Sequence, residues 1–154
     1  IKVQAAALLD EQPNQAIRSL PLDQKPYWHV ERARVGDTRK VPVELIVNGE
    51  AVAKTEIDAD GRTQELSFDY TLTQSSWVAL RIFPSSHTNP VFVEVDGKPI
   101  RASRKSAQWC LDAVDVCWQK KEPQTRDWEK PAAAVAYEHA RAEYKKILQE
   151  ATAD

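Results

Sequence analysis

The spacing of apolar residues changes once along this chain, near Ala102, and this change constrains the fold more than any other feature. Before Ala102, apolar residues recur at every second position in short runs, which is the period of β-strands. After it, they recur every three or four positions, which is the period of an α-helix. No helical pattern separates the strands, so parallel strand–helix–strand units are not expected. The pattern predicts an antiparallel β region followed by helices.

Roughly seven or eight short strands are predicted before Ala102, with turn residues between them. Asn48-Gly49 joins two alternating runs and is the strongest hairpin signal, because both residue types tolerate a positive φ. Asp60-Gly61 predicts a second turn, and the proline-punctuated stretch 10–26 predicts a long loop. The predicted strands cover residues 1–9, 27–35, 41–47, 52–57, 66–72, 77–83 and 91–95.

The expected fold class is mainly β: an antiparallel immunoglobulin-like β-sandwich over residues 1–102, followed by a C-terminal two-helix hairpin. The first helix is expected to begin at Ser103 or Ser106 as N-cap and to end before Pro123. The second is expected to begin between Asp127 and Pro131 and to run to about Glu150. Residues 103–154 are expected to pack on the sandwich, so that both parts form one structural unit. The apolar stripe of the first helix consists of Ala107, Cys110, Leu111, Val114, Cys117 and Trp118.

Metal, cofactor and disulfide chemistry are not expected in this chain. On one helix, Cys110 and Cys117 lie about 10.5 Å apart along the axis, too far to form a disulfide with each other. His29, His87 and His139 fall in different predicted elements, and no metal-ligand spacing connects them. The interpretation of both cysteines is packing as small apolar side chains.

The near-equal numbers of basic and acidic residues limit the kinds of partner that this chain can attract by charge. Lys and Arg number 21, Asp and Glu 23, and the net charge of −2 gives no field that attracts nucleic acid. No apolar run approaches the length that spans a bilayer, so membrane insertion is not expected. The chain holds no Met, and the expectation is that it is an excised or processed piece of a longer protein.

Two stretches of the β region carry candidate ligand-binding residues. Trp28 and His29, with the nearby arginines, suggest an aromatic and cationic binding face, and the alternative is that Trp28 packs in the core. His87 and Asn89 lie in the polar stretch 84–90 between two strands, where Ser85 and Ser86 suggest a nucleophile and base. The alternative for this loop is a wide turn whose polar side chains bond the local backbone. Trp77, one strand earlier, is interpreted as core.

The start of the first helix is the third candidate site. Arg101 and Arg104, with Lys105, place cationic side chains beside the free amides of the first helical turn, which together can bind an anion. The alternative is a solvated helix start. No catalytic residue and no metal ligand is assigned anywhere in the chain.

Two segments resemble a known family. WVALRIFPSSHTNPVFVEVDGKPIRASRKSAQWC, preceded by PYWHVERARVGDTRKVPVELIVNG, resembles the C-terminal β-rich region of CehA/McbA-type metallohydrolase-like proteins, from near Val3 to about Tyr144. These large proteins carry a PHP-like catalytic domain that is similar to metal-dependent hydrolases of ester-like or phosphoester-like bonds. The resemblance implies that the metal ligands belong to an upstream domain, that this chain contains none of them, and that the protein is extracytoplasmic, either periplasmic or secreted.

The function expected on these grounds is that of a non-catalytic accessory domain, which packs on the upstream catalytic domain or mediates self-association as a homodimer. The first alternative is an extracellular β-sandwich module that binds carbohydrate or another ligand through exposed aromatic side chains. The second is a self-contained hydrolase that uses Ser85, Ser86 and His87.

Overall fold

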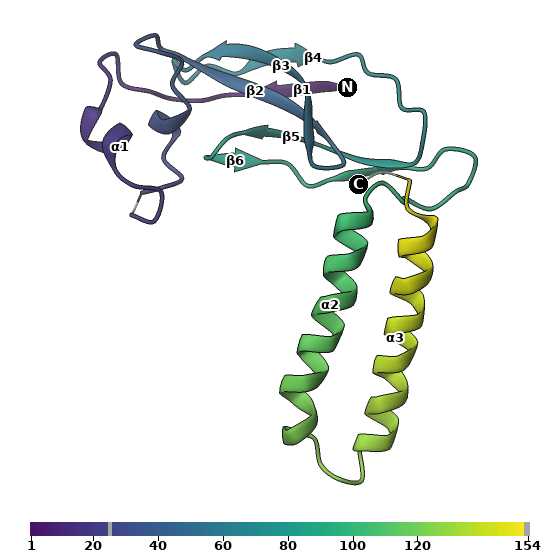
Figure 1. Cartoon of the computed structure of the whole chain (residues 1–154). Helices are drawn as coiled ribbons and strands as arrows, with labels where there is room; N and C mark the ends of the chain where they lie inside the picture. Colours follow the sequence, from purple (N-terminus) through teal and green to yellow (C-terminus); the bar gives the residue numbers. More distant parts are fainter. Residues whose placement is uncertain (25, 153–154) are drawn as a thin grey trace. The chain divides into compact units, whose positions relative to one another are not determined.

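A computed structural model describes residues 1–24 and 26–152, which divide into unit 1, Ile1–Asp96, and unit 2, Gly97–Asp154. Unit 1 holds two antiparallel sheets and unit 2 holds a pair of helices (Figure 1). These antiparallel sheets and the C-terminal helix pair are confirmed. Helix accounts for 34% and strand for 26%, so the fold is mixed α/β, and the expectation of a mainly β chain is wrong. The reason is that the two helices are long whereas the strands are short.

Unit 1 contains a five-stranded and a two-stranded sheet. The larger has the order β3-β2-β5-β6, and β7 pairs with β5. In the smaller sheet β1 pairs with β4. Every strand in both sheets runs antiparallel to its neighbours. The strands are β1 Lys2–Ala5, β2 Lys40–Val47, β3 Glu50–Asp58, β4 Gln64–Ser67, β5 Ser76–Ile82, β6 Ser86–His87 and β7 Val91–Val93.

The predicted hairpin joins β2 to β3. Asn48 and Gly49 have φ values of 52° and 99°, both in the left-handed region that Asn and Gly adopt at lowest cost. The second predicted turn is also confirmed, since Gly61 has a φ of 87° and Asp60 Oδ1 accepts from the Arg62 amide at 2.9 Å. Local turn chemistry therefore fixes the two changes of direction around β3.

One hydrophobic core joins the two sheets of unit 1. Its buried centre includes Val43 and Leu45 of β2 and Leu80 of β5, and Val3 and Leu66 of the smaller sheet pack against it. In β5, buried residues alternate with half-buried ones at every position. This period of two means that the strand has one face on the core and an opposite face turned away from it.

Two predictions in unit 1 are wrong. The stretch 27–35, predicted to be a strand, contains the 3-10 helix η1, Val30–Ala33, and the predicted loop 10–26 contains the short helix α1, Gln15–Ser19. Side chains cap both starts: His29 Nδ1 accepts from the Glu31 amide at 3.0 Å, and Asn14 Oδ1 accepts from the Ile17 amide at 3.1 Å. The residues that alternate in 27–35 do not form a strand, because side chains such as His29 and Arg34 bond within the stretch and stabilise a turn.

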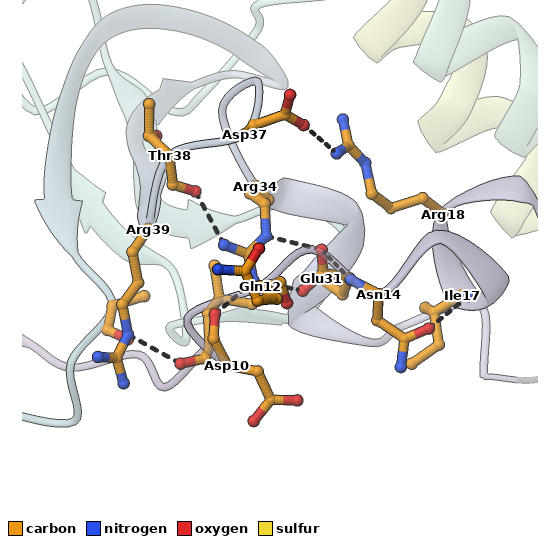
Figure 2. A network of polar contacts seen from close by, with 12 residues as sticks. Asp10, Gln12, Asn14, Ile17, Arg18, Glu31, Arg34, Asp37, Thr38 and Arg39 are labelled. Atoms are coloured by element: carbon orange, nitrogen blue, oxygen red, sulfur yellow. Dashed lines mark hydrogen bonds and ion pairs between the residues drawn. The ribbon is translucent and has the colours of Figure 1, made fainter.

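A buried ion pair organises this irregular region (Figure 2). Arg34 Nε donates to Glu31 Oε1 at 2.7 Å and Arg34 Nη2 donates to Glu31 Oε2 at 2.8 Å, with both side chains almost fully buried. The same guanidinium donates to the carbonyl oxygens of Asp10 at 2.7 Å and Thr38 at 3.0 Å, while the Asn14 amide donates to Glu31. The ion pair therefore connects η1 by hydrogen bonds to the segment 10–14 and to the turn at Thr38, neither of which is part of a strand.

The Glu31 carboxylate makes the stability of unit 1 depend on pH. The hydrogen bond from Arg34 holds its pKa below the ordinary glutamate value, despite burial that opposes this. A lowered folded-state pKa contributes stability that is complete above the unfolded-state pKa and is lost as the pH falls toward the folded-state value. We expect the free energy of unfolding to decrease below about pH 4.3, and to decrease less steeply in Glu31→Gln. Denaturant titrations of both proteins across this range measure it, and equal slopes would contradict the assignment.

Unit 2 is an antiparallel helical hairpin, as predicted. Helix α2, Arg104–Lys121, begins at Ser103, whose side chain accepts from the Ser106 amide at 3.1 Å. The 3-10 turn η2, Glu122–Gln124, and helix α3, Lys130–Glu150, follow. The segment before α2 lies in unit 2, and within this unit Thr152 N donates to Arg101 O at 3.0 Å. The packing of the hairpin on the sandwich stays a prediction.

Candidate functional site

The face of the five-stranded sheet that points away from the core carries a groove, here called the sheet groove. Its volume is about 680 Å³, within the range of roughly 300–1,000 Å³ that ligand sites occupy. Apolar and aromatic side chains dominate its floor, and polar ones gather in the turn between β5 and β6. Its lining includes Ile46, Trp77, Ala79, Arg81, Phe83, Ser85, Ser86, His87, Thr88 and Phe92.

Strand register brings the aromatic side chains of the sheet groove together. Trp77 of β5 pairs with Phe92 of β7, and Ala79 of β5 pairs with Ile46 of β2. Residues that pair directly across antiparallel strands present their side chains on the same face. These four residues therefore form one continuous apolar surface that is built from three different strands, β2, β5 and β7.

The positive charge of Arg81, which lines the sheet groove, is neutralised by Glu44. Arg81 Nε donates to Glu44 Oε2 at 2.7 Å, and the Arg81 guanidinium lies 5.3 Å from the centre of the Phe83 ring. The half-buried ion pair and the aromatic ring hold this cation in place. Arg81 is thus engaged by the protein's own side chains, and what the groove offers a ligand is chiefly apolar contact.

His87 is the predicted site residue that the structure places in the sheet groove. It pairs with Arg81 across the strands, and it also lines a second groove of about 230 Å³ beside β1. Its Nδ1 lies 3.0 Å from the Thr88 carbonyl oxygen, which can only accept, so Nδ1 carries the proton in this contact. In the described ranges no hydrogen bond joins this ring to Ser85 or Ser86. The loop forms a turn here, with the Ser85 amide donating to Ile82 O at 2.8 Å.

Trp28 and His29 do not line the sheet groove. Trp28 is exposed and packs edge-on against Tyr27, with ring centres 4.8 Å apart. The proposed core position of Trp28 is therefore wrong. His29 serves as the cap of η1, where its Nδ1 accepts from the backbone, so one ring nitrogen has a local structural role. Whether these two residues bind a ligand stays a prediction.

The remaining candidate ligand-binding residues, Asn89, Arg101 and Arg104, do not line the sheet groove with His87. Asn89 is exposed in the connection between β6 and β7. Arg101 pairs with Glu150 at the end of α3, with Nε and Oε2 2.7 Å apart, and Arg104 is the exposed first residue of α2. The carboxylate beside Arg101 offsets its charge, so the predicted anion site at the helix start stays a prediction.

Sequence reasoning missed the aromatic residues of the sheet groove. Trp77 was expected in the core, but it lies on the opposite face of β5 from the buried Val78 and Leu80. A signal for this existed, because Trp77, Ala79 and Arg81 alternate with the core residues at a period of two. Phe83 and Phe92 are also exposed, and each has one sequence neighbour that packs in or against the core, Ile82 and Val93 respectively.

No group of three or more His, Cys, Asp or Glu side chains in residues 1–24 and 26–152 is placed to hold a metal ion. Among the helices of the same ranges, none is long and apolar enough to cross a bilayer.

Comparison of the chain with protein-family models, curated proteins and solved structures finds no match. The resemblance to CehA/McbA-type proteins therefore stays a prediction.

Proposed function

We propose that this chain is a non-catalytic accessory domain that packs, through the sheet groove, on another domain of the protein to which it belongs. The resemblance stated above suggests a PHP-type metal-dependent hydrolase as that domain and an extracytoplasmic location. We further infer that the two sheets of unit 1 form a small immunoglobulin-like sandwich, a scaffold that commonly presents binding surfaces. The observation that carries the proposal is the aromatic sheet groove on the outer face of the sheet.

The chemistry of the sheet groove favours a protein surface as its occupant. Phe83 and Phe92 are exposed large apolar side chains that line the sheet groove together with Trp77, and solvent exposure of such a surface is unfavourable unless something covers it. Apolar and aromatic side chains are the groups that anchor protein interfaces. The one cation of the groove, Arg81, is already paired with Glu44, so an apolar partner leaves no charge uncompensated.

A carbohydrate-binding module is the second candidate, because Trp77 and Phe92 lie together on one open face. Aromatic rings can stack on the apolar faces of sugars. A sugar also needs several polar partners for its hydroxyls, and in the sheet groove these are confined to the turn 85–88. The distribution of polar groups therefore favours the first candidate.

A Phe92→Ser substitution is expected to weaken binding of an apolar fluorescent probe, 1-anilinonaphthalene-8-sulfonate, several-fold, because it removes one wall of the sheet groove. The matched control is Val91→Ser. Val91 is 65% exposed and Phe92 is 68% exposed, but Val91 pairs with the core-facing Val78 and therefore lies on the opposite face. Fluorescence titration of the three proteins measures the effect, and equal affinities would show that the groove is not an apolar binding surface.

Three other outcomes would overturn the proposed function. Saturable binding on a glycan array that is lost in Trp77→Ala would establish the carbohydrate-binding module. Hydrolysis of p-nitrophenyl esters that is lost in His87→Ala would establish the hydrolase. A coding sequence that lacks a PHP-like domain with its His and Asp ligands upstream of Ile1 would remove the proposed partner.

A further inference from the structure

The turn between β2 and β3 contains the asparagine of this chain whose side-chain amide is most open to chemical attack. The chain holds three asparagines, and of these only Asn48 is followed by glycine. Gly49 has no Cβ to obstruct an approach of its backbone nitrogen to the preceding side chain. Asn89 precedes Pro90, which has no backbone N–H to react. The sequence therefore singles out Asn48 for deamidation, a reaction to which asparagines are prone on heating.

Deamidation of Asn48 needs water but neither an oxidant nor a reductant. The Gly49 backbone nitrogen loses its proton and attacks Cγ of Asn48. A bond forms between this nitrogen and Cγ, the bond between Cγ and Nδ2 breaks, and Nδ2 leaves as ammonia, which takes up the proton. Water then opens the resulting cyclic imide at either of its two carbonyl carbons. The products are aspartate and isoaspartate, and in isoaspartate the main chain runs through Cγ.

In the folded chain, β5 holds the side-chain atoms that this reaction must move. Asn48 Nδ2 donates to Ser76 Oγ at 3.0 Å, and Asn48 Oδ1 accepts from the Trp77 backbone N–H at 3.0 Å. The Asn48 backbone N–H also donates to Trp77 O at 3.0 Å. Ser76 is 1% exposed, so water does not reach its hydroxyl to take the place of the Asn48 amide. Cγ of Asn48 can therefore turn toward Gly49 only after both side-chain hydrogen bonds break.

The products of deamidation cannot restore these contacts. The Ser76 hydroxyl donates its one proton to Gln74 O at 2.9 Å, so it accepts from the Asn48 amide but cannot also donate to a carboxylate there. A half-buried carboxylate oxygen that faces this hydroxyl without a donor is unfavourable. An isoaspartate adds one main-chain atom to a two-residue turn whose length sets the register of β2 with β3. Both products are therefore expected to destabilise the hairpin.

We propose that Asn48 is a site of spontaneous deamidation that folding closes, so that a chain which opens at this turn can be altered irreversibly. The reactive state is the one in which the turn has separated from β5. When closing is faster than the chemistry, the reaction rate follows the population of that open state. Gly49 and Trp77 both line the sheet groove, so deamidation alters one wall of this groove. The chemistry of Asn48 does not depend on which partner the groove binds.

Peptide mass spectrometry after incubation at mildly alkaline pH, with and without guanidinium chloride, tests the proposal. Each deamidation replaces an NH2 group by OH, and the gain in mass is assigned to one peptide. In denaturant, Asn48 is expected to react faster than Asn14, which precedes Gln15. Without denaturant, the Asn48 rate is expected to be lower by at least about 10-fold. Equal Asn48 rates in the two conditions would overturn the proposal, as would an Asn48 rate in denaturant no higher than that of Asn14.

Ser76→Ala tests the hydrogen bond that closes the site. Without denaturant this variant is expected to raise the Asn48 rate by about 3-fold or more, and in denaturant the rate should not change. Ser75→Ala is the matched control: Ser75 is also buried, but its hydroxyl bonds the backbone of Val95, so the Asn48 rate should rise less. Equal rises in both variants would overturn the role of the bond between Asn48 and Ser76.

Asn48→Asp reproduces one of the two products directly. Its midpoint of unfolding in guanidinium chloride is expected to shift to a lower concentration than that of the wild type, because one carboxylate oxygen faces Ser76 without a donor. An unchanged midpoint would contradict the expected damage to the hairpin. Binding of the apolar probe by Phe92→Ser does not involve this reaction, so failure of the present proposal is distinguishable from failure of the proposed function.

Discussion

An Arg34→Met variant should unfold with a free energy lower by about 3–5 kcal/mol than that of the wild type. Methionine keeps much of the length of arginine but none of its donors. The Arg34 side chain is 0% exposed, so its loss leaves the Glu31 carboxylate buried without its cation. The carbonyl oxygens of Asp10 and Thr38 lose their donor as well. Hydrogen exchange of the β2 amides measures the effect, because it reports the opening of unit 1.

The control for this prediction is Arg18→Met. Arg18 pairs with Asp37 at 3.0 Å, but the carboxylate is 83% exposed, so the loss should remain below about 1 kcal/mol. The double variant Glu31→Leu with Arg34→Met should recover part of the stability, since replacing both partners of a buried pair leaves no unpaired charge. Equal effects of Arg34→Met and Arg18→Met would contradict the organising role of the buried pair.

Leu45→Ala should destabilise unit 1 by about 2–5 kcal/mol. Leu45 is 0% exposed at the centre of β2, between its partners Ala53 of β3 and Leu80 of β5. Truncation removes three carbon atoms from the hydrophobic core and leaves a cavity. The flanking strands cannot move in to fill this cavity without losing their register with β2. The same hydrogen-exchange measurement on β2 and β5 amides gives the change.

Leu22→Ala is the control for this core substitution. Leu22 is 70% exposed, and its truncation should change the free energy of unfolding by less than about 0.5 kcal/mol. If Leu45→Ala also falls within that limit, the shared core between the two sheets is not the main source of stability in unit 1.

The parts of the fold predicted from sequence are those that local patterns specify. The strand β2, its turn at Asn48-Gly49 and the strand β3 follow from alternation and from two residues that accept a positive φ. Helix α2 follows from an apolar stripe and a serine cap, both of which lie within the helix or directly before it. Each signal comes from residues close in sequence, which is why a single sequence suffices to find it.

The stretch 27–35 shows how such a signal misleads. Its alternating residues resemble a strand, but Arg34 and Glu31 are three positions apart, a spacing that suits a helical turn when the two side chains pair. Burial of that pair depends on Asp10 and Thr38, which come from other segments. The competition between strand and turn is thus decided by partners outside the stretch.

The candidate site was predicted only in part. His87 was selected because it lies in a polar loop, and the structure places it in the sheet groove. The sequence does not point to Trp77 or Phe92 as site residues, since an aromatic residue in an apolar strand is more often in the core. Their role depends on which face of the sheet is covered, and a pattern of period two identifies two faces without saying which is buried.

By itself, the sequence determined the division into a β part and a helical part, the main turns and the helix starts, because period, glycine geometry and capping act over a few residues. Only the tertiary structure decided that β7 pairs with β5, which puts Phe92 beside Trp77, and that Arg34 is buried against Glu31. The first depends on which neighbouring strands pair, and the second on Asp10 and Thr38, which lie outside the turn that holds the pair. The free energy of such contacts comes from shared burial and not from local preference.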